Sequence, residues 1–276
     1  MNKFLRPPFK IHGGKRYLYS WILEYLPEQP PDGFEYYDYL EPFCGAASVL
    51  LNKEKPDTPA KEIINDLDPG VIAIMKTLRD ESEAFIKKLK NITYSERVFL
   101  RELKRCKDGV FDNDFDHAIN EFIVRRMSRG GLKQAFAWSD RMRGGQPGDV
   151  NAWETILTVL PAISERIKDV FILQKPACQV IKAFDYENII VYCDPPYVPD
   201  SRISKDTYEM EMTTDNHIEL ATVLNNFKGK VILSGYPSTL YKRLYKNWKC
   251  VKKKIANHAS QQKEKGVKVE CLWLNF

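Results

Sequence analysis

The stretch IIVYCDPPY, residues 189–197, decides the fold of this chain. Its first five residues are apolar and rich in β-branched side chains, which predicts a buried strand, and the two prolines must end that strand because they have no N–H to donate. The strand end can hold the Asp194 carboxylate and the Pro195 carbonyl as fixed acceptors, while Tyr197 offers a flat ring. Acceptors beside a stacking face suit an aminopurine or aminopyrimidine and predict a methyl-transfer site for an exocyclic amine. An ordinary strand-ending turn, with Tyr197 capping the core, is the alternative.

Length and composition are typical of a globular protein. The 276 residues can bury one large core, or a core with an inserted subdomain, and 43% of them are hydrophobic. No apolar run approaches the roughly 20 residues of a membrane span, and the N-terminus has no signal-peptide core, so we expect a cytoplasmic protein without a membrane partner. The six cysteines are scattered, without a C-x-x-C pair or a histidine at zinc spacing, so no metal site is expected.

A glycine-bearing loop is predicted near the start of the chain. Gly13 and Gly14 precede Lys15, and an apolar helical pattern follows. Backbone N–H groups at such a helix start can hold an anion, and Lys15 would add a positive charge. A solvated loop is the alternative.

A second loop follows the aromatic strand predicted over residues 36–40. The sequence EPFCGAAS, residues 41–48, then leads into an apolar stretch predicted to be helical over residues 49–51. Small residues such as Gly45 allow close approach of the backbone to a ligand, and Glu41 can accept hydrogen bonds at the strand end. A plain strand-to-helix turn is the alternative.

Two aspartates follow the next predicted strand, residues 62–64. Asp66 lies roughly 20 residues beyond the glycine turn, where a nucleoside-binding βαβ unit carries the acid that binds the ribose. Asp68 stands immediately before Pro69 and an apolar helical pattern, so we expect it to cap that helix.

Residues 80–177 have a charged, helical pattern and predict an inserted subdomain. Within it, six basic side chains stand among glycines and aromatic residues and are opposed only by Asp140. Such a composition suits a surface that follows phosphates and stacks against bases, although a solvated basic loop is the alternative. The six residues are Arg125, Arg126, Arg129, Lys133, Arg141 and Arg143.

The last third of the chain alternates strands and helices. A helix is predicted over residues 215–227 and a strand over 231–233, and residues 249–255 and 269–274 predict a terminal antiparallel hairpin. The polar segment 198–213 predicts a mobile flap.

Four segments in this order resemble the Dam-like (alpha-group) DNA N6-adenine methyltransferases of phage or mobile-element type: GGK (13–15), EPFCGAAS (41–48), INDLD (64–68) and YCDPPY (192–197). The resemblance implies an α/β, Rossmann-like methyltransferase fold, with a mostly parallel sheet, an antiparallel terminal hairpin and an inserted helical target-recognition subdomain. The implied division is 1–79 for the cofactor-binding half, 80–177 for the insertion and 178–276 for the catalytic half. The glycine loop that reads F-x-G-x-G in the family carries Ala47 at its second glycine.

The resemblance also implies the reaction, a site-specific transfer of a methyl group from S-adenosylmethionine to the N6 amine of a flipped-out adenine in duplex DNA, with S-adenosylhomocysteine as product. The implied catalytic residues are Asp194, Pro195, Pro196 and Tyr197 with Lys15. The implied cofactor-binding residues are Gly13, Gly14, Lys15, Glu41, Phe43, Gly45, Asp66 and Asp194.

Three alternatives and extensions accompany this interpretation. A methyltransferase that acts on RNA, or on the N4 amine of cytosine, could use the same acceptors and ring. A nucleic-acid-binding module with a decayed catalytic core is the non-enzymatic alternative. A restriction endonuclease partner, like the oligomeric state, depends on more than this chain.

Overall fold

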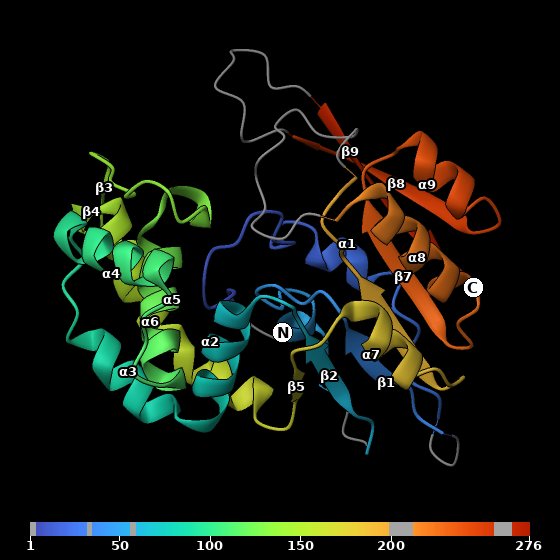
Figure 1. Cartoon of the computed structure of the whole chain (residues 1–276), viewed down its shortest axis with the longest axis horizontal. Helices are drawn as coiled ribbons and strands as arrows, with labels where there is room; N and C mark the ends of the chain where they lie inside the picture. Colours follow the sequence, from blue (N-terminus) through green and yellow to red (C-terminus); the bar gives the residue numbers. More distant parts are fainter. Residues whose placement is uncertain (1–3, 32–34, 56–58, 199–211, 257–266) are drawn as a thin grey trace. The chain divides into compact units, whose positions relative to one another are not determined.

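The computed structural model describes residues 4–31, 35–55, 59–198, 212–256 and 267–276. The chain divides into two compact units, each assembled from separate segments of sequence (Figure 1). The first unit comprises Met1–Leu23, Cys44–Lys55 and Asp66–Gln174, and the second comprises Glu24–Phe43, Pro56–Asn65 and Lys175–Phe276.

A sheet with the order β2-β1-β6-β7-β9-β8 forms the second unit. Strands β2, β1, β6 and β7 are parallel, whereas β9 is antiparallel to both β7 and β8. This arrangement confirms the predicted mostly parallel sheet with an antiparallel terminal hairpin. Its strands are β1 (Asp38–Glu41), β2 (Glu62–Asn65), β6 (Ile189–Cys193), β7 (Lys230–Gly235), β8 (Lys249–Ala256) and β9 (Val267–Leu274), and its helices are α7 (Ala177–Ala183), α8 (Thr214–Asn225) and α9 (Thr239–Leu244).

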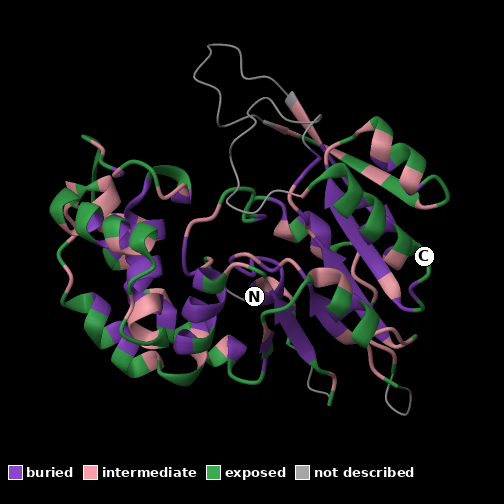
Figure 2. Cartoon of the chain, in the orientation of Figure 1, coloured by how far each residue is buried: buried purple, intermediate pink, exposed green. Residues whose placement is uncertain are grey.

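The central strands are buried along their whole length, as Figure 2 shows. Continuous apolar runs such as Ile189–Cys193 are expected where a parallel strand is covered on both faces. Strand β6 ends at Cys193, immediately before Asp194, as the two prolines predict. Asn65, the last residue of β2, links two other segments of the chain. Its side-chain amide donates to the Pro42 carbonyl at 3.0 Å and to the Lys175 carbonyl at 2.9 Å.

Helices make up most of the first unit. An aromatic core joins three of them: the rings of Phe85 and Phe122 meet edge to face at 5.5 Å, and Phe122 meets Trp153 at 5.7 Å. The elements are α1 (Tyr19–Leu23), η1 (Leu50–Asn52), α2 (Pro69–Asp80), α3 (Ser82–Lys90), α4 (Glu96–Asp108), α5 (Asp114–Met127), η2 (Arg129–Gly131), β3 (Met142–Arg143), β4 (Gln146–Pro147), α6 (Gly148–Ile167) and β5 (Phe171–Leu173).

Two local predictions have different outcomes in this unit. Asp68 caps α2 and Pro69 begins it, as predicted. The helix predicted over residues 49–51 is instead the 3-10 turn η1, which ends after Asn52. The Asn52 side chain is bound to the backbone of Leu5 and Ser48, and the chain leaves in an extended conformation at Lys53, so no α-helix continues there.

The compact units divide the chain at points other than the predicted boundaries. Helix α2, placed in the cofactor-binding half by the sequence, belongs to the same unit as helices α3 to α6. The predicted division at residues 80 and 178 therefore remains a hypothesis about function. Most of the predicted flap, residues 199–211, lies outside the described residues. None of the described helices is long and apolar enough to cross a membrane.

Candidate active site

The Asp194 carboxylate is held at the end of β6 by a buried serine. Ser234, on the neighbouring strand β7, donates its hydroxyl to Asp194 Oδ1 at 2.6 Å. The Tyr192 hydroxyl in turn donates to Ser234 Oγ at 3.3 Å. Since Ser234 is completely buried, solvent does not compete for this contact. The arrangement therefore orients the Asp194 carboxylate at the end of β6.

Tyr197 is buried against a second carboxylate. Its hydroxyl donates to Glu270 Oε1 on β9, and its ring meets the Tyr236 ring edge to face at 4.4 Å. Burial, together with the charges of Asp194 and Glu270, raises the pKa of Tyr197 far above its ordinary value, so the phenol stays protonated. Ser234, Tyr236 and Glu270 were not among the predicted site residues. Glu270 had a signal in the sequence, because it is a lone acid in the apolar strand VECLWL, residues 269–274.

Glu41 and Phe43 lie at the end of strand β1 in the same unit. Glu41 is only 2% exposed, and its Oε1 accepts a hydrogen bond from the Tyr39 hydroxyl at 2.8 Å. Phe43 is half-buried. The structure therefore places the Glu41 carboxylate where a strand-end acceptor was predicted.

The first unit holds Asp66 against the glycine loop. The Gly45 N–H donates to Asp66 Oδ2 at 2.8 Å, and the Asp68 N–H donates to Asp66 Oδ1 at 3.0 Å. Burial raises the pKa of Asp66, and these two hydrogen bonds oppose the rise. Gly45 has φ +50° and Ala47 has φ +51°, so the alanine that replaces the family's second glycine adopts a left-handed conformation, at a cost of roughly 1–2 kcal/mol.

The N-terminal loop packs beside the glycine loop within this unit. Ile11 lies against both glycines. A Cβ built on Gly14 would be 3.3 Å from the nearest Ile11 atom, and a Cβ built on Gly45 would be 3.5 Å from the nearest Ile11 atom. Gly13 and Gly14 are exposed, whereas Lys15 is buried and its Nζ donates to the Gly13 carbonyl at 3.1 Å. The structure thus brings Gly13, Gly14, Lys15, Gly45 and Asp66 into one region of the first unit.

Three of the six predicted DNA-binding side chains are engaged inside the protein. Arg125 is 3% exposed and pairs with Asp68 and Glu121, and the Lys133 ammonium pairs with Glu121. Arg126 donates to the Ala152 carbonyl. Burial and nearby positive charges lower the pKa of Arg126 to about 10. The structure therefore does not present the six side chains as one exposed surface: Arg125 is buried with its partners, and the DNA contact predicted for Arg126 and Lys133 stays a prediction.

The other three, Arg129, Arg141 and Arg143, are exposed. Arg143 ends strand β3, which pairs with β4 in a short hairpin. Gly144 and Gly145 form the turn of this hairpin with φ values of +59° and +81°. Two consecutive positive φ angles are typical of tight hairpin turns, which glycine adopts without strain. Trp138 and Met142 nearby in the sequence are 62% and 63% exposed.

Comparisons with known proteins find similar sequences over most of this chain. The family model for D12 class N6 adenine-specific DNA methyltransferases matches residues 12–260. The type II methyltransferase M1.LlaDCHI of Lactococcus lactis subsp. cremoris is 26% identical over 261 residues, 88% of this chain and 86% of its own length. The DNA adenine methylase of Haemophilus influenzae is 22% identical and covers 97% of this chain and 92% of itself, and that of Vibrio cholerae is 24% identical, with 86% and 83% covered.

Proposed function

Because the chain belongs to the D12 class N6 adenine-specific DNA methyltransferases, we propose that Asp194 to Tyr197 receive the adenine whose N6 amine is methylated. The observation that carries this assignment is the Ser234 hydrogen bond, which fixes the Asp194 carboxylate at 2.6 Å beside the buried ring of Tyr197. The family match favours adenine in DNA over the RNA and cytosine alternatives.

Asp194 and the Pro195 carbonyl have a defined role in this proposal. The adenine amine is a poor nucleophile, because its lone pair is delocalised into the ring. Two fixed acceptors draw on its N–H bonds and stabilise the positive charge that develops on nitrogen during the reaction. Such acceptors are effective when they are preorganised, and the buried Ser234 supplies that order for Asp194.

Tyr197 would support the base outside the helix. An adenine in duplex DNA is buried in the stack and must be flipped out, at a cost of about a few kcal/mol. Stacking on an aromatic ring offsets part of that cost. The Glu270 hydrogen bond and the Tyr236 contact hold the Tyr197 ring in one orientation, so little further ordering is needed.

S-adenosylmethionine is the methyl donor that this function implies. When bound, it supplies a methyl group activated by the adjacent sulfonium charge. Asp66 and Gly45 suit its nucleoside, since a carboxylate follows strand β2 and a glycine with positive φ leaves the backbone uncovered by a side chain. Lys15, Gly13 and Gly14 adjoin this region, and we assign them to the same site.

Arg129, Arg141 and Arg143 are the proposed contacts to duplex DNA. They are exposed; Arg141 immediately precedes the hairpin strand β3, and Arg143 is its last residue. Arginines on a protruding loop can pair with phosphates from any sequence and so position the enzyme on DNA. We place this activity in the cytoplasm. A restriction endonuclease partner is supported only by the type II name of the Lactococcus relative.

Transfer of labelled methyl groups to unmethylated duplex DNA tests the proposal. The wild type should yield N6-methyladenine after nucleoside digestion, and Asp194→Ala should yield none while binding the cofactor normally. Asp66→Ala should weaken cofactor binding instead. Asp215→Ala, a change at an exposed acid in the same unit as Asp194, serves as the matched control and should methylate like the wild type. Equal loss of cofactor binding in Asp194→Ala and Asp66→Ala would refute the division of roles.

A further inference from the structure

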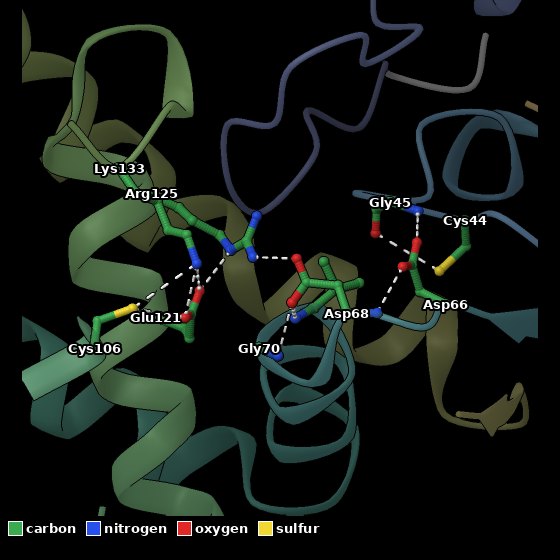
Figure 3. Close-up of polar contacts among 10 residues, drawn as sticks. Cys44, Gly45, Asp66, Asp68, Gly70, Cys106, Glu121, Arg125 and Lys133 are labelled. Carbon is green, nitrogen blue, oxygen red and sulfur yellow. Dashed lines mark hydrogen bonds and ion pairs between the residues drawn. The ribbon is translucent and has the colours of Figure 1, made fainter. Parts of the chain in front are cut away.

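A buried ion network lies beside the proposed cofactor residues of the first unit (Figure 3). Arg125 on α5 donates to Asp68 Oδ2 at 2.6 Å and to Glu121 Oε2 at 2.8 Å. Lys133 donates to Glu121 Oε1 at 3.1 Å, and the Cys106 thiol donates to the same oxygen at 3.0 Å. Two acids and two bases thus balance in charge.

Asp68 ties this network to Asp66. Its Oδ1 accepts from the N–H groups of Gly70 (2.9 Å) and Val71 (3.2 Å), which caps helix α2. Its other carboxylate oxygen accepts from Arg125, and its own N–H donates to Asp66 Oδ1. Asp68 therefore cannot shift without disturbing the carboxylate of Asp66.

The start of helix α2 is shaped to receive Glu121. A Cβ added at Gly70 would lie 2.4 Å from Glu121 Cδ, so only glycine permits this approach. The N-terminal end of a helix also favours a nearby negative charge. Burial alone would raise the pKa of Asp68 and Glu121, but Arg125 and Lys133 outweigh it and lower both. Both carboxylates therefore remain charged at neutral pH, and so does Arg125, whose own pKa is raised by the two acids.

The network is an unusual way to fill a core. Replacing buried ion pairs by apolar residues is often neutral or stabilising, so stability alone is a weak reason for this arrangement. An arginine with two fixed partners does, however, define the angle at which it holds each carboxylate. Here one of those carboxylates is the residue that supports Asp66.

We propose that Arg125 is a positioning residue of the cofactor site: its ion pair with Asp68 holds the turn at residues 66–68 in the geometry that binds the nucleoside of S-adenosylmethionine. This rests on the proposed function only in taking Asp66 as a cofactor ligand. It gives Arg125 a role inside the enzyme in place of the DNA contact expected from the sequence.

Binding of S-adenosylhomocysteine to the full-length protein, measured by calorimetry, tests this inference. Arg125→Met should weaken binding about tenfold, because Asp68 loses the group that fixes it. Asp68→Asn keeps a capping oxygen for α2 but loses the charge, and it should weaken binding similarly. The double variant should bind no more weakly than the weaker single variant, since both changes disrupt one contact.

Arg105→Met provides the matched control. Arg105 lies on α4 in the same unit and pairs with Glu102 and Asp116. Neither partner belongs to the turn at residues 66–68. It should lower Tm without changing the affinity for S-adenosylhomocysteine. Amide hydrogen exchange of the unliganded protein gives a second measurement, in which Arg125→Met should speed exchange at Asp68 and the control should not.

The outcomes separate this inference from the proposed function. If Arg125→Met lowers Tm but binds S-adenosylhomocysteine within twofold of the wild type, the network is merely structural and the inference is wrong. If Asp66→Ala also binds normally, the assignment of Asp66 to the cofactor fails first. Loss of affinity in Asp66→Ala, Arg125→Met and Asp68→Asn, with a normal control, supports both.

Discussion

Removing the Ser234 hydroxyl should slow methyl transfer while leaving the cofactor affinity unchanged. The Ser234 side chain is completely buried, so in Ser234→Ala water has no access from solvent to replace the 2.6 Å contact to Asp194. A hydrogen bond to a charged group contributes about 1.5–3 kcal/mol. Each 1.36 kcal/mol corresponds to a tenfold change in rate, so we expect the rate of the chemical step to fall about 10- to 150-fold.

Single-turnover kinetics with enzyme in excess over duplex DNA would measure that step directly. Ser234→Ala also removes the acceptor of the Tyr192 hydroxyl, which by itself lowers stability. Tyr192→Phe is therefore the matched control: it deletes that hydroxyl, leaves the contact between Ser234 and Asp194, and should react within about threefold of the wild type. A Ser234→Ala rate within twofold of the wild type would refute the view that a held carboxylate drives the reaction.

Three further changes have defined outcomes. Glu270→Leu removes an acceptor of the buried Tyr197 hydroxyl and should lower the free energy of unfolding by about 1–3 kcal/mol in thermal melts, whereas Glu270→Gln should restore most of it. Replacing Arg141 and Arg143 together by Ala should reduce the slope of log affinity for DNA against log salt concentration by about 2, and an unchanged slope in titrations would contradict their phosphate contacts. Burial and a neighbouring arginine lower the pKa of Lys10 to about 8, so its charged form destabilises the fold increasingly as the pH falls from 10.5 through 8. Lys10→Met should therefore raise the free energy of unfolding at pH 7 by at most about 3 kcal/mol, which thermal melts would show as a higher Tm. It should have little effect near pH 10.5, and equal shifts of Tm at both pH values would contradict this explanation.

The sequence predicted those parts of the structure that depend on local chemistry. The apolar run before Asp194 forms strand β6 because β-branched side chains favour a covered strand, and it ends where two prolines remove the donors. Asp68 caps α2 because a short carboxylate before a proline satisfies the first N–H groups of a helix. Each signal lies within a few residues of its effect.

Partners distant in the chain were beyond such reasoning. Ser234 follows Asp194 by 40 residues and Glu270 follows Tyr197 by 73, and neither pair has a spacing that indicates contact. These contacts arise because parallel pairing sets β7 beside β6, and antiparallel pairing then sets β9 beside β7. The order of strands in a sheet, which local periodicity does not specify, decides which side chains meet at the strand ends.

The burial of Arg125 was indicated by helical spacing in the sequence, but the basic composition of the segment outweighed that signal. It stands seven residues after Ala118 and three after Phe122, so helical spacing places all three on one buried face of α5. Glu121 stands four residues before it, at the spacing of a helical ion pair. Composition grouped Arg125 with the exposed arginines, whereas periodicity separates it from them.

Asp66 and Asp194, the carboxylates to which we assign cofactor binding and catalysis, are held in different ways, and this difference predicts where substitutions will act. Asp66 is held by the N–H groups of Gly45 and Asp68, which no substitution other than proline removes. Asp194 is held by the Ser234 hydroxyl, which a single substitution deletes. A side-chain substitution can therefore remove the hydrogen bond to Asp194 directly. It can change the hydrogen bonds to Asp66 only by moving the backbone that carries the two N–H donors. Arg125 binds the side chain of Asp68 and so acts on that backbone. In our proposal, a substitution at Arg125 therefore alters cofactor binding although Arg125 is distant in sequence and is not itself a ligand of the cofactor.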